Sequence, residues 1–402
     1  MIWVISEVYY PDEAATSHFM THIAEGLAKK SAVSVICARS NISNYPVTVC
    51  WKENHNNVQI QRCLSTTLDK KKYFLRLINA IVISLSIFFR SLISIKKNDS
   101  ILVVTNPPFL PFIVLLVCKI RRAKCVLRID DVYPEAFINA GLIKSHSFLA
   151  RILNWFSKKL YQCVDQIVVI GRDMKELIET KINKSSCNKL KIITNWADLE
   201  LVSPLPRSQN SLLQELNLSS KFVVQYAGNM GPLQGLDSLI KAAIKLKDYE
   251  SIHFLFIGSG KMLPWLKEEI SKVSLKNVTL LDQRPRSDQS NFLNACDVAF
   301  VSLKAGMAGV GVPSRMYNIL AAGKPIIGVM DDYSELSRVI HEEKVGWLAS
   351  PEDPAQIANV ILEASQNPAL LIEMGHRARR VAEIKYSSQA IINAYGELMD
   401  LA

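Results

Sequence analysis

The 402-residue sequence lacks several patterns that would assign it quickly to a class. Its eight cysteines are scattered and form no Cys-x-x-Cys pair, so neither a zinc site nor a disulfide framework is indicated. It has no internal repeat and no low-complexity region. Charged residues make up 21% of the chain and hydrophobic residues 49%, as in a globular protein with a somewhat apolar surface. The chain is too long for one hydrophobic core, so two domains are expected.

Two common phosphate-binding fingerprints are also absent. The loop GNMGPLQG at 228–235 is not Gly-x-Gly-x-x-Gly, and no Lys-Ser/Thr follows it as in a Walker loop. The basic clusters lack interleaved aromatic residues and a recognisable nucleic-acid module, so no nucleic-acid partner is expected. The net charge of +10 therefore favours a phosphorylated substrate or an anionic membrane surface.

The first residues, MIWVIS, carry no basic segment and no cleavage site. They are predicted to form a strand rather than a signal peptide. Together with the scattered cysteines, this favours a reducing cytoplasm.

Short apolar runs alternate with helical patterns along most of the chain, which indicates an α/β fold. In the first half, strands are predicted at 2–6, 33–37, 58–62, 101–105, 125–129, 166–170 and 192–194, and helices at 16–30, 74–95, 109–118, 149–164 and 171–181. In the second half, strands are predicted at 222–226, 253–257, 278–281, 297–301 and 325–329, and helices at 236–247, 261–272 and 288–295. Loops are predicted at 41–46 and 227–235, and the segment 201–220 is the best linker candidate.

These patterns predict two Rossmann-like domains that face each other across a cleft. The expected division places one domain at 1–200 and the other at 201–387. The last helix, at about 388–402, has no obvious place in the second sheet and is expected to pack back on the first domain.

The helix at 74–95 is unusually apolar, although Arg76, Asn79 and Arg90 interrupt it. Lysines at 70–72, 96 and 97 flank it. Three interpretations are open: a buried or half-buried helix of the domain, a helix lying in a membrane interface, or a membrane span. With the helix at 109–118 and the basic residues up to 124, it predicts one membrane-facing surface at 74–97 and 109–124.

The stretch 309–328 carries the strongest local signal for a ligand site. A glycine-rich segment leads to Pro313 and Ser314, which predict a helix start with Ser314 able to act as the cap. Arg315 in the first turn suits a bound diphosphate. Gly323 is expected to end the helix. The alternative is an ordinary strand-loop-helix-strand unit.

Carboxylates form a second candidate site. Asp130, Asp131 and Glu135 follow a predicted strand, where they can orient a hydroxyl or act as a general base. Alternatively, Asp131 caps a helix whose first turn contains Glu135. His18 and His22 have a spacing that can hold a metal, but no further ligand cluster accompanies them, so no metal is expected.

Five segments in this order resemble the GT-B glycosyltransferases of the large family 4, over nearly the whole chain. They are YYPD at 9–12, DVYPE at 131–135, NWAD at 195–198, GNMG at 228–231 with QG at 234–235, and VPSRMYN at 312–318 with AAGKP at 321–325. Within the family, the chain looks like the subgroup that builds bacterial O-antigens and capsules, including the L-fucosamine transferases.

The resemblance implies a UDP-sugar donor held mainly by the second domain, an acceptor against the first, and transfer with retention and without a metal or other cofactor. Arg315 would stabilise the leaving UDP, and Asp131 or Asp130 would position the acceptor hydroxyl. The donor side would comprise Gly228, Asn229, Gly231, Gln234, Gly235, Arg284, Pro313, Ser314, Arg315 and Asn318. The acceptor side would comprise Ala15, Thr16, Asp131 and Glu135.

The sequence departs from the family pattern at several of these positions. Val310 and Asn318 stand where the pattern has glutamates, and Asp130 replaces the usual histidine. The loop at 228–235 also lacks the common Arg and Lys. Phosphate binding is therefore expected to depend on Arg315, with Arg284 or Lys304.

The resulting prediction is a retaining, membrane-associated glycosyltransferase on the cytoplasmic face of the cell membrane. It would move a sugar, with N-acetyl-L-fucosamine the best guess, from its UDP form to a polyprenyl-diphosphate-linked acceptor. A nucleotide-sugar 2-epimerase of the same fold is one alternative. A catalytically inactive GT-B subunit that binds a partner is another, favoured by the loss of both glutamates.

Overall fold

A computed structural model describes residues 1–39, 50–66 and 73–399 of the chain. The loop predicted at 41–46 and the lysines at 70–72 lie outside these residues. The described chain divides into two compact units, which are treated one at a time below. The first comprises 1–138, 143–194 and 389–402, and the second comprises 139–142 and 195–388.

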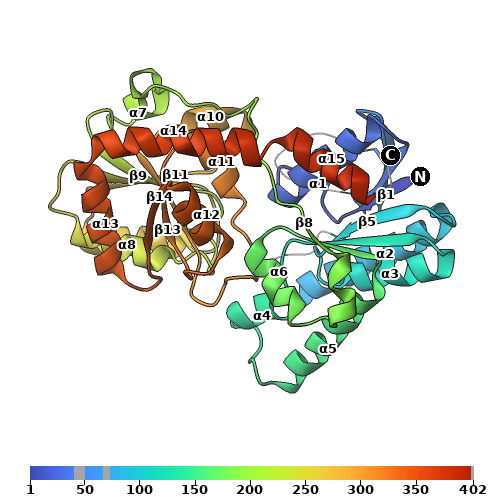
Figure 1. Cartoon of the computed structure of the whole chain (residues 1–402). Helices are drawn as coiled ribbons and strands as arrows, with labels where there is room; N and C mark the ends of the chain where they lie inside the picture. Colours follow the sequence, from blue (N-terminus) through green and yellow to red (C-terminus); the bar gives the residue numbers. More distant parts are fainter. Residues whose placement is uncertain (40–49, 67–72, 400–402) are drawn as a thin grey trace. The chain divides into compact units, whose positions relative to one another are not determined.

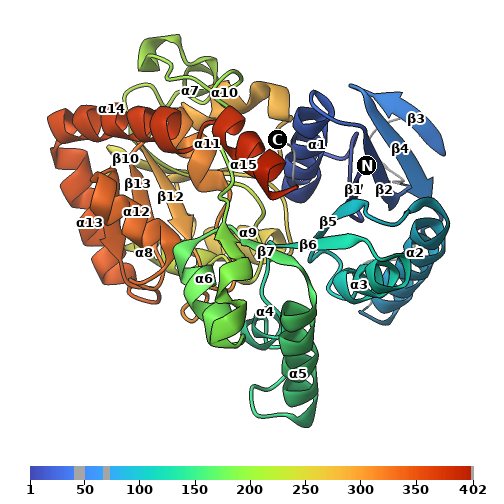
Figure 2. The same ribbon diagram turned by 45° about the vertical axis from the view of Figure 1, so that its right-hand side comes forward.

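The first unit is built on an eight-stranded sheet in the order β3-β4-β2-β1-β5-β6-β7-β8. All neighbouring pairs are parallel except β3 and β4 (Figure 1). Figure 2 shows β3 and β4 at one edge of this sheet. The strands are β1 (Ile2–Ile5), β2 (Val33–Ala38), β3 (Lys52–His55), β4 (Val58–Cys63), β5 (Ser100–Val104), β6 (Lys124–Ile129), β7 (Gln166–Val169) and β8 (Leu190–Ile192).

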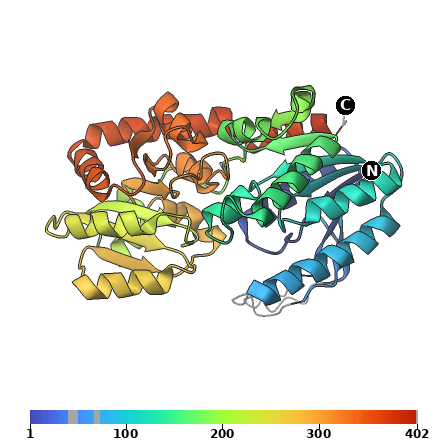
Figure 3. The ribbon, with the colours of Figure 1, turned by 90° about the horizontal axis from the view of Figure 1, so that it is seen from below.

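Helices cover both faces of this sheet, which explains why its central strands are mostly apolar. Helices α2, α3 and α5 lie on one face (Figure 3), and α1 and α15 lie side by side on the other (Figures 1 and 2). The helices are α1 (Ala15–Ala28), α2 (Tyr73–Ser94), α3 (Leu110–Arg121), α4 (Glu135–Asn139), α5 (Phe148–Cys163), α6 (Arg172–Glu179), the 3-10 helix η1 (Lys184–Lys189) and α15 (Ser388–Leu398).

The second unit is built on a six-stranded parallel sheet in the order β11-β10-β9-β12-β13-β14. Its strands are β9 (Phe222–Ala227), β10 (Ile252–Ile257), β11 (Val278–Leu281), β12 (Val298–Ser302), β13 (Ile326–Val329) and β14 (Gly346–Ala349). Its helices are α7 (Ser211–Glu215), α8 (Leu236–Lys245), α9 (Leu263–Val273), α10 (Gln289–Leu293), α11 (Arg315–Ala321), α12 (Glu335–Glu343), α13 (Pro354–Gln366) and α14 (Pro368–Lys385), with 3-10 helices η2 (Arg207–Gln209) and η3 (Arg286–Asp288).

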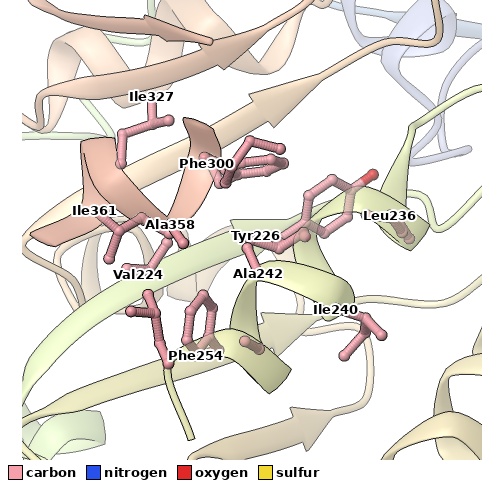
Figure 4. Close-up of a cluster of buried hydrophobic side chains, with 14 of the residues drawn as sticks. Val224, Tyr226, Leu236, Ile240, Ala242, Phe254, Phe300, Ile327, Ala358 and Ile361 are labelled. Atoms are coloured by element: carbon pink, nitrogen blue, oxygen red, sulfur yellow. The ribbon is translucent and has the colours of Figure 1, made fainter. Parts of the chain in front are cut away.

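The core of the second unit forms where β9, β10 and β12 pack against α8 and α13. Val224, Phe254, Phe300 and Ile361 are fully or almost fully buried there (Figure 4). Each such side chain contributes about 1.5–3 kcal/mol when removed from water. Tyr226 belongs to the same cluster, but its hydroxyl points away from the other side chains (Figure 4). Packing in this core therefore fixes the position of the Tyr226 hydroxyl near the end of β9.

The predicted α/β fold is confirmed as two Rossmann-like sheets. The sequence places the domain boundary between residues 200 and 201, whereas in the structure the chain passes from the first unit to the second between 194 and 195. The predicted linker at 201–220 contains α7 and η2. The elements that were not predicted include β3, η1, η2, α7, α12 and β14.

Among the helices that the structure describes, none combines the length and the apolar character needed to cross a bilayer.

Candidate functional site

Two glycine-containing loops are hydrogen-bonded to each other at the carboxyl end of the second sheet. The Gly228 amide donates to Ile257 O at 2.9 Å, and the Met230 amide donates to Ser259 O at 2.8 Å. A Cβ on Gly258 would lie 2.0 Å from the carbonyl oxygen of Gly228, and one on Gly260 would lie 2.5 Å from that of Met230. The loop at 228–231 therefore depends on the second loop. Sequence reasoning missed this second loop, although Gly-Ser-Gly directly after a predicted strand was a usable signal.

Arg315 is brought onto this loop from the start of α11. Its Nη2 donates to Gln234 Oε1 at 2.5 Å. Its Cζ lies 4.5 Å from the ring centroid of Tyr226. A Cβ on Gly228 would lie 3.4 Å from the same Cζ, at a φ of +141° that favours glycine. Three predicted site residues, Gly228, Gln234 and Arg315, thus lie together, and Tyr226 is a fourth member that its apolar strand pattern did not reveal.

The guanidinium of Arg315 is only partly satisfied by the protein. Its Nη1 is buried and has no hydrogen-bond partner among the described residues. A buried donor left unpaired costs about 1–3 kcal/mol, more when it is charged. Burial also raises the pKa of Tyr226, and the positive charge of Arg315 acts in the opposite direction. This cluster of Gly228, Gln234, Tyr226 and Arg315, called the arginine cluster below, therefore carries a positive charge with one unpaired donor, which is the chemistry that suits an anionic ligand.

The predicted cap of α11 is wrong. Ser314 has φ −60° and ψ −20°, and its side chain makes no capping hydrogen bond. A capping residue needs extended backbone to aim its oxygen at the first turn, and here Ser314 and Pro313 precede α11 with Ser314 already in helical geometry. The predicted end of the helix is confirmed, since Gly323 follows the helix with a φ of +64°.

The residues directly before the glycine-rich segment bind a carboxylate of the protein itself. The carboxylate of Asp331 accepts hydrogen bonds from the amides of Gly306, at 3.0 and 3.1 Å, and Ala308, at 3.0 Å. These two amides are therefore engaged by a protein side chain. Val310, one of the departures from the family pattern, is buried.

Asn318 is buried and tied into a polar network of the second unit. Its Oδ1 accepts from the backbone amide of Asp198 at 2.8 Å, and its Nδ2 donates to Asp198 Oδ2 at 3.3 Å and to Gln289 Oε1 at 3.1 Å. Asp198 Oδ2 also pairs with Arg286 at 3.0 Å. A neutral amide suits this position, because a carboxylate there would meet the carboxylate of Asp198.

The other predicted donor residues have separate surroundings. Arg284 pairs with Asp288 at 2.5 Å, so its charge is matched within the second unit. Asn229 accepts a hydrogen bond from the Tyr226 hydroxyl through its backbone oxygen at 2.6 Å, and its Nδ2 would lie 3.1 Å from a Cβ on Gly231. Gly235 precedes α8 with a φ of +59°.

In the first unit, the two adjacent aspartates lie directly after β6. The amides of Asp130 and Asp131 both donate to Thr105 Oγ1, at 3.1 and 3.3 Å. Asp130 Oδ2 accepts from Thr16 Oγ1 at 3.5 Å. Asp130 Oδ1 accepts from Nε of Arg128 at 2.8 Å. The structure thus brings the predicted Thr16 to the predicted Asp130.

The pKa of Asp131 is raised to about 6, by desolvation in the surrounding protein and then by the negative charge of Asp130. The residue nevertheless has an exposed surface, so the adjacent charge is the cause that the geometry supports most directly. A carboxyl group that titrates near pH 6 is suited to proton transfer near neutral pH.

Glu135 and Ala15 stand apart from this pair in their contacts. Glu135 Oε1 accepts from Lys181 Nζ at 2.5 Å, and Lys181 also donates to Asn154 at 3.0 Å. Desolvation lowers the pKa of Lys181, while Glu135 acts to raise it. Ala15 is the first residue of α1. Glu135 lies in the first turn of α4.

The rings of His18 and His22 are tilted by 48° to each other with centroids 4.2 Å apart, and His22 Nδ1 lies 2.9 Å from the backbone oxygen of His18. Across residues 1–39, 50–66 and 73–399, no group of three or more His, Cys, Asp or Glu side chains is placed to hold a metal ion.

Comparison with known proteins places these loops within a family. Residues 209–381 match the family model described as glycosyl transferases group 1. The probable glycosyltransferase WbjE of Pseudomonas aeruginosa is 35% identical over 292 residues, which cover 73% of this chain and 72% of that protein. The putative colanic acid biosynthesis glycosyl transferase WcaI of Escherichia coli (strain K12) is 25% identical over 352 residues, covering 86% and 84%.

Solved structures show the same fold at low identity. Sucrose-phosphate synthase from Thermosynechococcus elongatus matches with a TM-score of 0.79 at 15% identity, over 99% of this chain and 97% of that one. Anabaena Alr3699/HepE in complex with UDP and glucose matches with a TM-score of 0.75 at 14% identity, over 100% and 99%. Both sheets have the counterparts expected of the GT-B fold. With its relative at 35% identity and its matching family model, the chain belongs to the group 1 family of glycosyl transferases.

Proposed function

We propose that this protein is a retaining glycosyltransferase that moves a sugar from a UDP-sugar to a polyprenyl-diphosphate-linked acceptor in bacterial surface polysaccharide synthesis. The observation that carries the proposal is the buried, unpaired Nη1 of Arg315 beside Gly228 and Gln234. A diphosphate supplies the acceptor oxygens that this guanidinium lacks.

In the proposed reaction, Arg315 binds the donor diphosphate and stabilises the charge of UDP as it leaves. The bond between the anomeric carbon and the diphosphate oxygen breaks, and the UDP oxygen keeps the electron pair. The acceptor hydroxyl oxygen bonds to the anomeric carbon on the face that UDP leaves. A fixed cation that stabilises a developing anion typically contributes several kcal/mol to the rate. The proposal therefore requires no metal.

The choice of UDP is supported by the solved structure of Anabaena Alr3699/HepE with UDP and glucose. The choice of pathway is supported by WcaI, which is described as a putative colanic acid biosynthesis enzyme. Retention, and N-acetyl-L-fucosamine as the sugar, are supported by the resemblance of the five sequence segments.

For the acceptor, we assign Asp131 as the base that takes the proton of the reacting hydroxyl, with Asp130 as its charged neighbour. The pKa of Asp131, raised to about 6 by desolvation and by Asp130, leaves the group mostly ionised at neutral pH and basic enough to accept a proton. Thr16 completes this set through its hydrogen bond to Asp130.

The lipid-linked acceptor is supported by the outer face of α2. Its solvent-facing residues Ile81, Leu85, Phe89 and Ile93 repeat every four positions and are 47%, 49%, 60% and 77% exposed. Its buried face contains Ile83 and Ile87 together with Asn79, Ser84 and Ser91. A helix whose outer face meets water typically carries polar residues on that face. We therefore favour the interfacial interpretation of this helix over a buried one.

Neighbouring helices extend this apolar face. Leu116 and Ile120 of α3 are exposed, and Phe112 of α3 contacts Phe156 of α5 with ring centroids 6.2 Å apart. Trp155 and Phe148 of α5 are also exposed. Basic residues at the helix ends, Lys96, Lys97 and Lys119 among them, are exposed as well. Aromatic side chains with a basic rim suit the headgroup region of an anionic membrane, which supports the proposed position on the inner face of the cell membrane.

The experiment that tests the function is a transfer assay with UDP-sugars and a polyprenyl-diphosphate-linked sugar, followed by product mass spectrometry. The proposal expects UDP and an acceptor extended by one sugar, with the anomeric configuration of the donor retained. UDP together with a new free sugar, formed without acceptor, would instead indicate epimerisation. If no UDP-sugar is converted, and if Arg315→Ala binds UDP with the wild-type affinity, the proposed donor site is rejected.

A further inference from the structure

A buried arginine links the aspartate pair to the last helix of the chain. Arg128 lies in β6 and is 1% exposed. The neighbouring strand residues, Val126, Leu127 and Ile129, are all apolar and buried. A buried charge is strongly unfavourable unless it is paired and hydrogen-bonded. Arg128 is therefore present for its partners and not for the packing of the sheet.

Arg128 donates hydrogen bonds to two side chains, one directly after its own strand and one in the last helix. Its Nε donates to Asp130 Oδ1 at 2.8 Å, and its Nη1 donates to the Tyr395 hydroxyl of α15 at 2.6 Å. Its Cζ also lies 5.8 Å from the ring centroid of Phe19 in α1. Side chains two residues apart along a strand share a face, so Arg128 reaches Asp130 on the side covered by α1 and α15.

Tyr395 is fully buried and sits on a helix anchored to the same face. A Cβ on Gly26 of α1 would lie 2.5 Å from Cγ2 of Ile392, which shows how closely α15 packs there. The Tyr395 oxygen fixes one end of the planar guanidinium, and Asp130 fixes the other. A planar fork held at two points has little freedom to rotate.

We propose that Arg128 and Tyr395 are positioning residues, which hold the carboxylate of Asp130 in place beside Asp131. The proposal rests on the proposed function only in taking Asp131 as the group that acts on the acceptor hydroxyl. In this arrangement the C-terminal helix, remote in sequence, sets the electrostatics at the end of β6. Neither residue touches the reacting atoms.

The sign of the effect follows from the charges. The charged and titratable groups in this network are Asp130, Arg128 and Tyr395, while α1 contributes the Thr16 hydroxyl and β5 leads to the Thr105 hydroxyl. Arg128 partly neutralises Asp130. When the guanidinium is released from its Tyr395 anchor, Asp130 is less well compensated. Its fuller negative charge then raises the pKa of Asp131 further.

The test compares Tyr395→Phe, which removes a single oxygen atom, with Tyr161→Phe as a matched control. Tyr161 is another buried tyrosine of the first unit, and its hydroxyl bonds to Ser157 of its own helix. Both proteins are checked by thermal melting. The aspartate carboxyl groups are then titrated by NMR of ¹³C-labelled aspartate, with the signal of Asp131 assigned through Asp131→Asn.

In Tyr395→Phe we expect the Asp131 signal to titrate about one unit higher than in the wild type, the lower end of the usual effect of a nearby charge. The acid limb of the pH profile of kcat should move by the same amount, so that kcat falls about fivefold at pH 6, with the KM for the donor unchanged. Tyr161→Phe should leave the titration of Asp131 and the pH profile of kcat unchanged.

An unchanged Asp131 titration in folded Tyr395→Phe overturns the proposal. If that variant fails to fold, Asp130→Asn supplies the second measurement. It should lower the pKa of Asp131, and an unchanged titration again overturns the proposal. The NMR measurement needs no substrate, so a shift of the Asp131 signal in a protein that transfers no sugar would uphold the positioning role while rejecting the proposed function.

Discussion

Replacing Arg315 with methionine separates ligand binding from folding more sharply than any other single change. Methionine keeps much of the apolar stem of arginine and removes the guanidinium that contacts Gln234 and Tyr226. In the free protein, this removal also relieves the buried, unpaired Nη1. The two stability effects oppose each other, so we expect a change in unfolding free energy of less than about 1 kcal/mol.

Ligand binding should respond very differently. Hydrogen bonds to charged groups contribute about 1.5–3 kcal/mol, which corresponds to about 10- to 150-fold in Kd. Arg315→Met should therefore weaken UDP binding by that factor, with the melting temperature within a few degrees of the wild type. Isothermal titration calorimetry with UDP and a thermal melt measure the two quantities on one sample.

Arg207→Met is the matched control, because it should show the opposite pattern. Arg207 pairs with Asp297 at 2.6 Å and donates to the backbone oxygens of Ser219 and Leu218. Its loss should lower the melting temperature and leave the UDP affinity unchanged. A Kd for UDP within twofold of the wild type in Arg315→Met would refute the assignment of the arginine cluster as the diphosphate site.

Three further predictions concern the membrane face, the network at Asn318 and a buried histidine. The double variant Leu85→Ser, Phe89→Ser should reduce co-flotation with anionic vesicles several-fold, whereas the control Ile372→Ser, at an exposed apolar residue of α14, should not. Equal flotation of the wild type, the double variant and the control would contradict the membrane role of α2. Asn318→Asp should lower the stability at pH 7 by about 1–3 kcal/mol, because the new carboxylate meets Asp198, and the loss should shrink at pH 4–5; a pH-independent loss in thermal melts would point to packing instead. Desolvation lowers the pKa of His253 to about 4, so its neutral form should stabilise the fold above pH 6.5. This contribution of up to about 3 kcal/mol should be lost as the pH falls from 6.5 to 4. The unfolding free energy of His253→Gln in denaturant should therefore depend less on pH across that range, and a pH dependence equal to that of the wild type would exclude His253 as its cause.

The strands that carry the two candidate sites could be predicted because they are parallel and buried on both faces. Such strands are short, continuous apolar runs. β13 follows this rule, and β6 and β9 follow it apart from Lys124 and Arg128 in β6 and Gln225 in β9. Strand β3 was missed because it lies at the sheet edge and has exposed and half-exposed residues, without any apolar run. Among the strands that the structure describes, it pairs with β4.

Local signals failed where the outcome depended on long-range contacts. Ser314 has the right residue type for a cap, but the chain enters α11 already in helical geometry. The partners of Asn318 lie near positions 198 and 289, and no periodic pattern connects these segments. For the same reason, the link from Arg128 to Tyr395 could not be anticipated, because the two residues are 267 positions apart.

The helix at 74–95 shows what hydropathy alone leaves open. Its length and composition were compatible with burial, with an interface and with a span. The structure adds which side each residue occupies: Ile83, Ser84, Ile87 and Ser91 face inward, and Phe89 and Ile93 face outward. That choice depends on where α2 packs on the sheet, which the sequence of the helix does not contain.

The measurement that tests the central claim most directly is transfer from a panel of UDP-sugars to a polyprenyl-diphosphate-linked sugar, read by mass spectrometry of the lipid. The proposed function predicts one added sugar on the lipid and release of UDP by the wild-type protein. Product formation should fall by more than tenfold in Arg315→Met and stay at the wild-type level in Ile372→Ser. Transfer at the wild-type rate by Arg315→Met, or release of UDP without any change in the lipid, would contradict it.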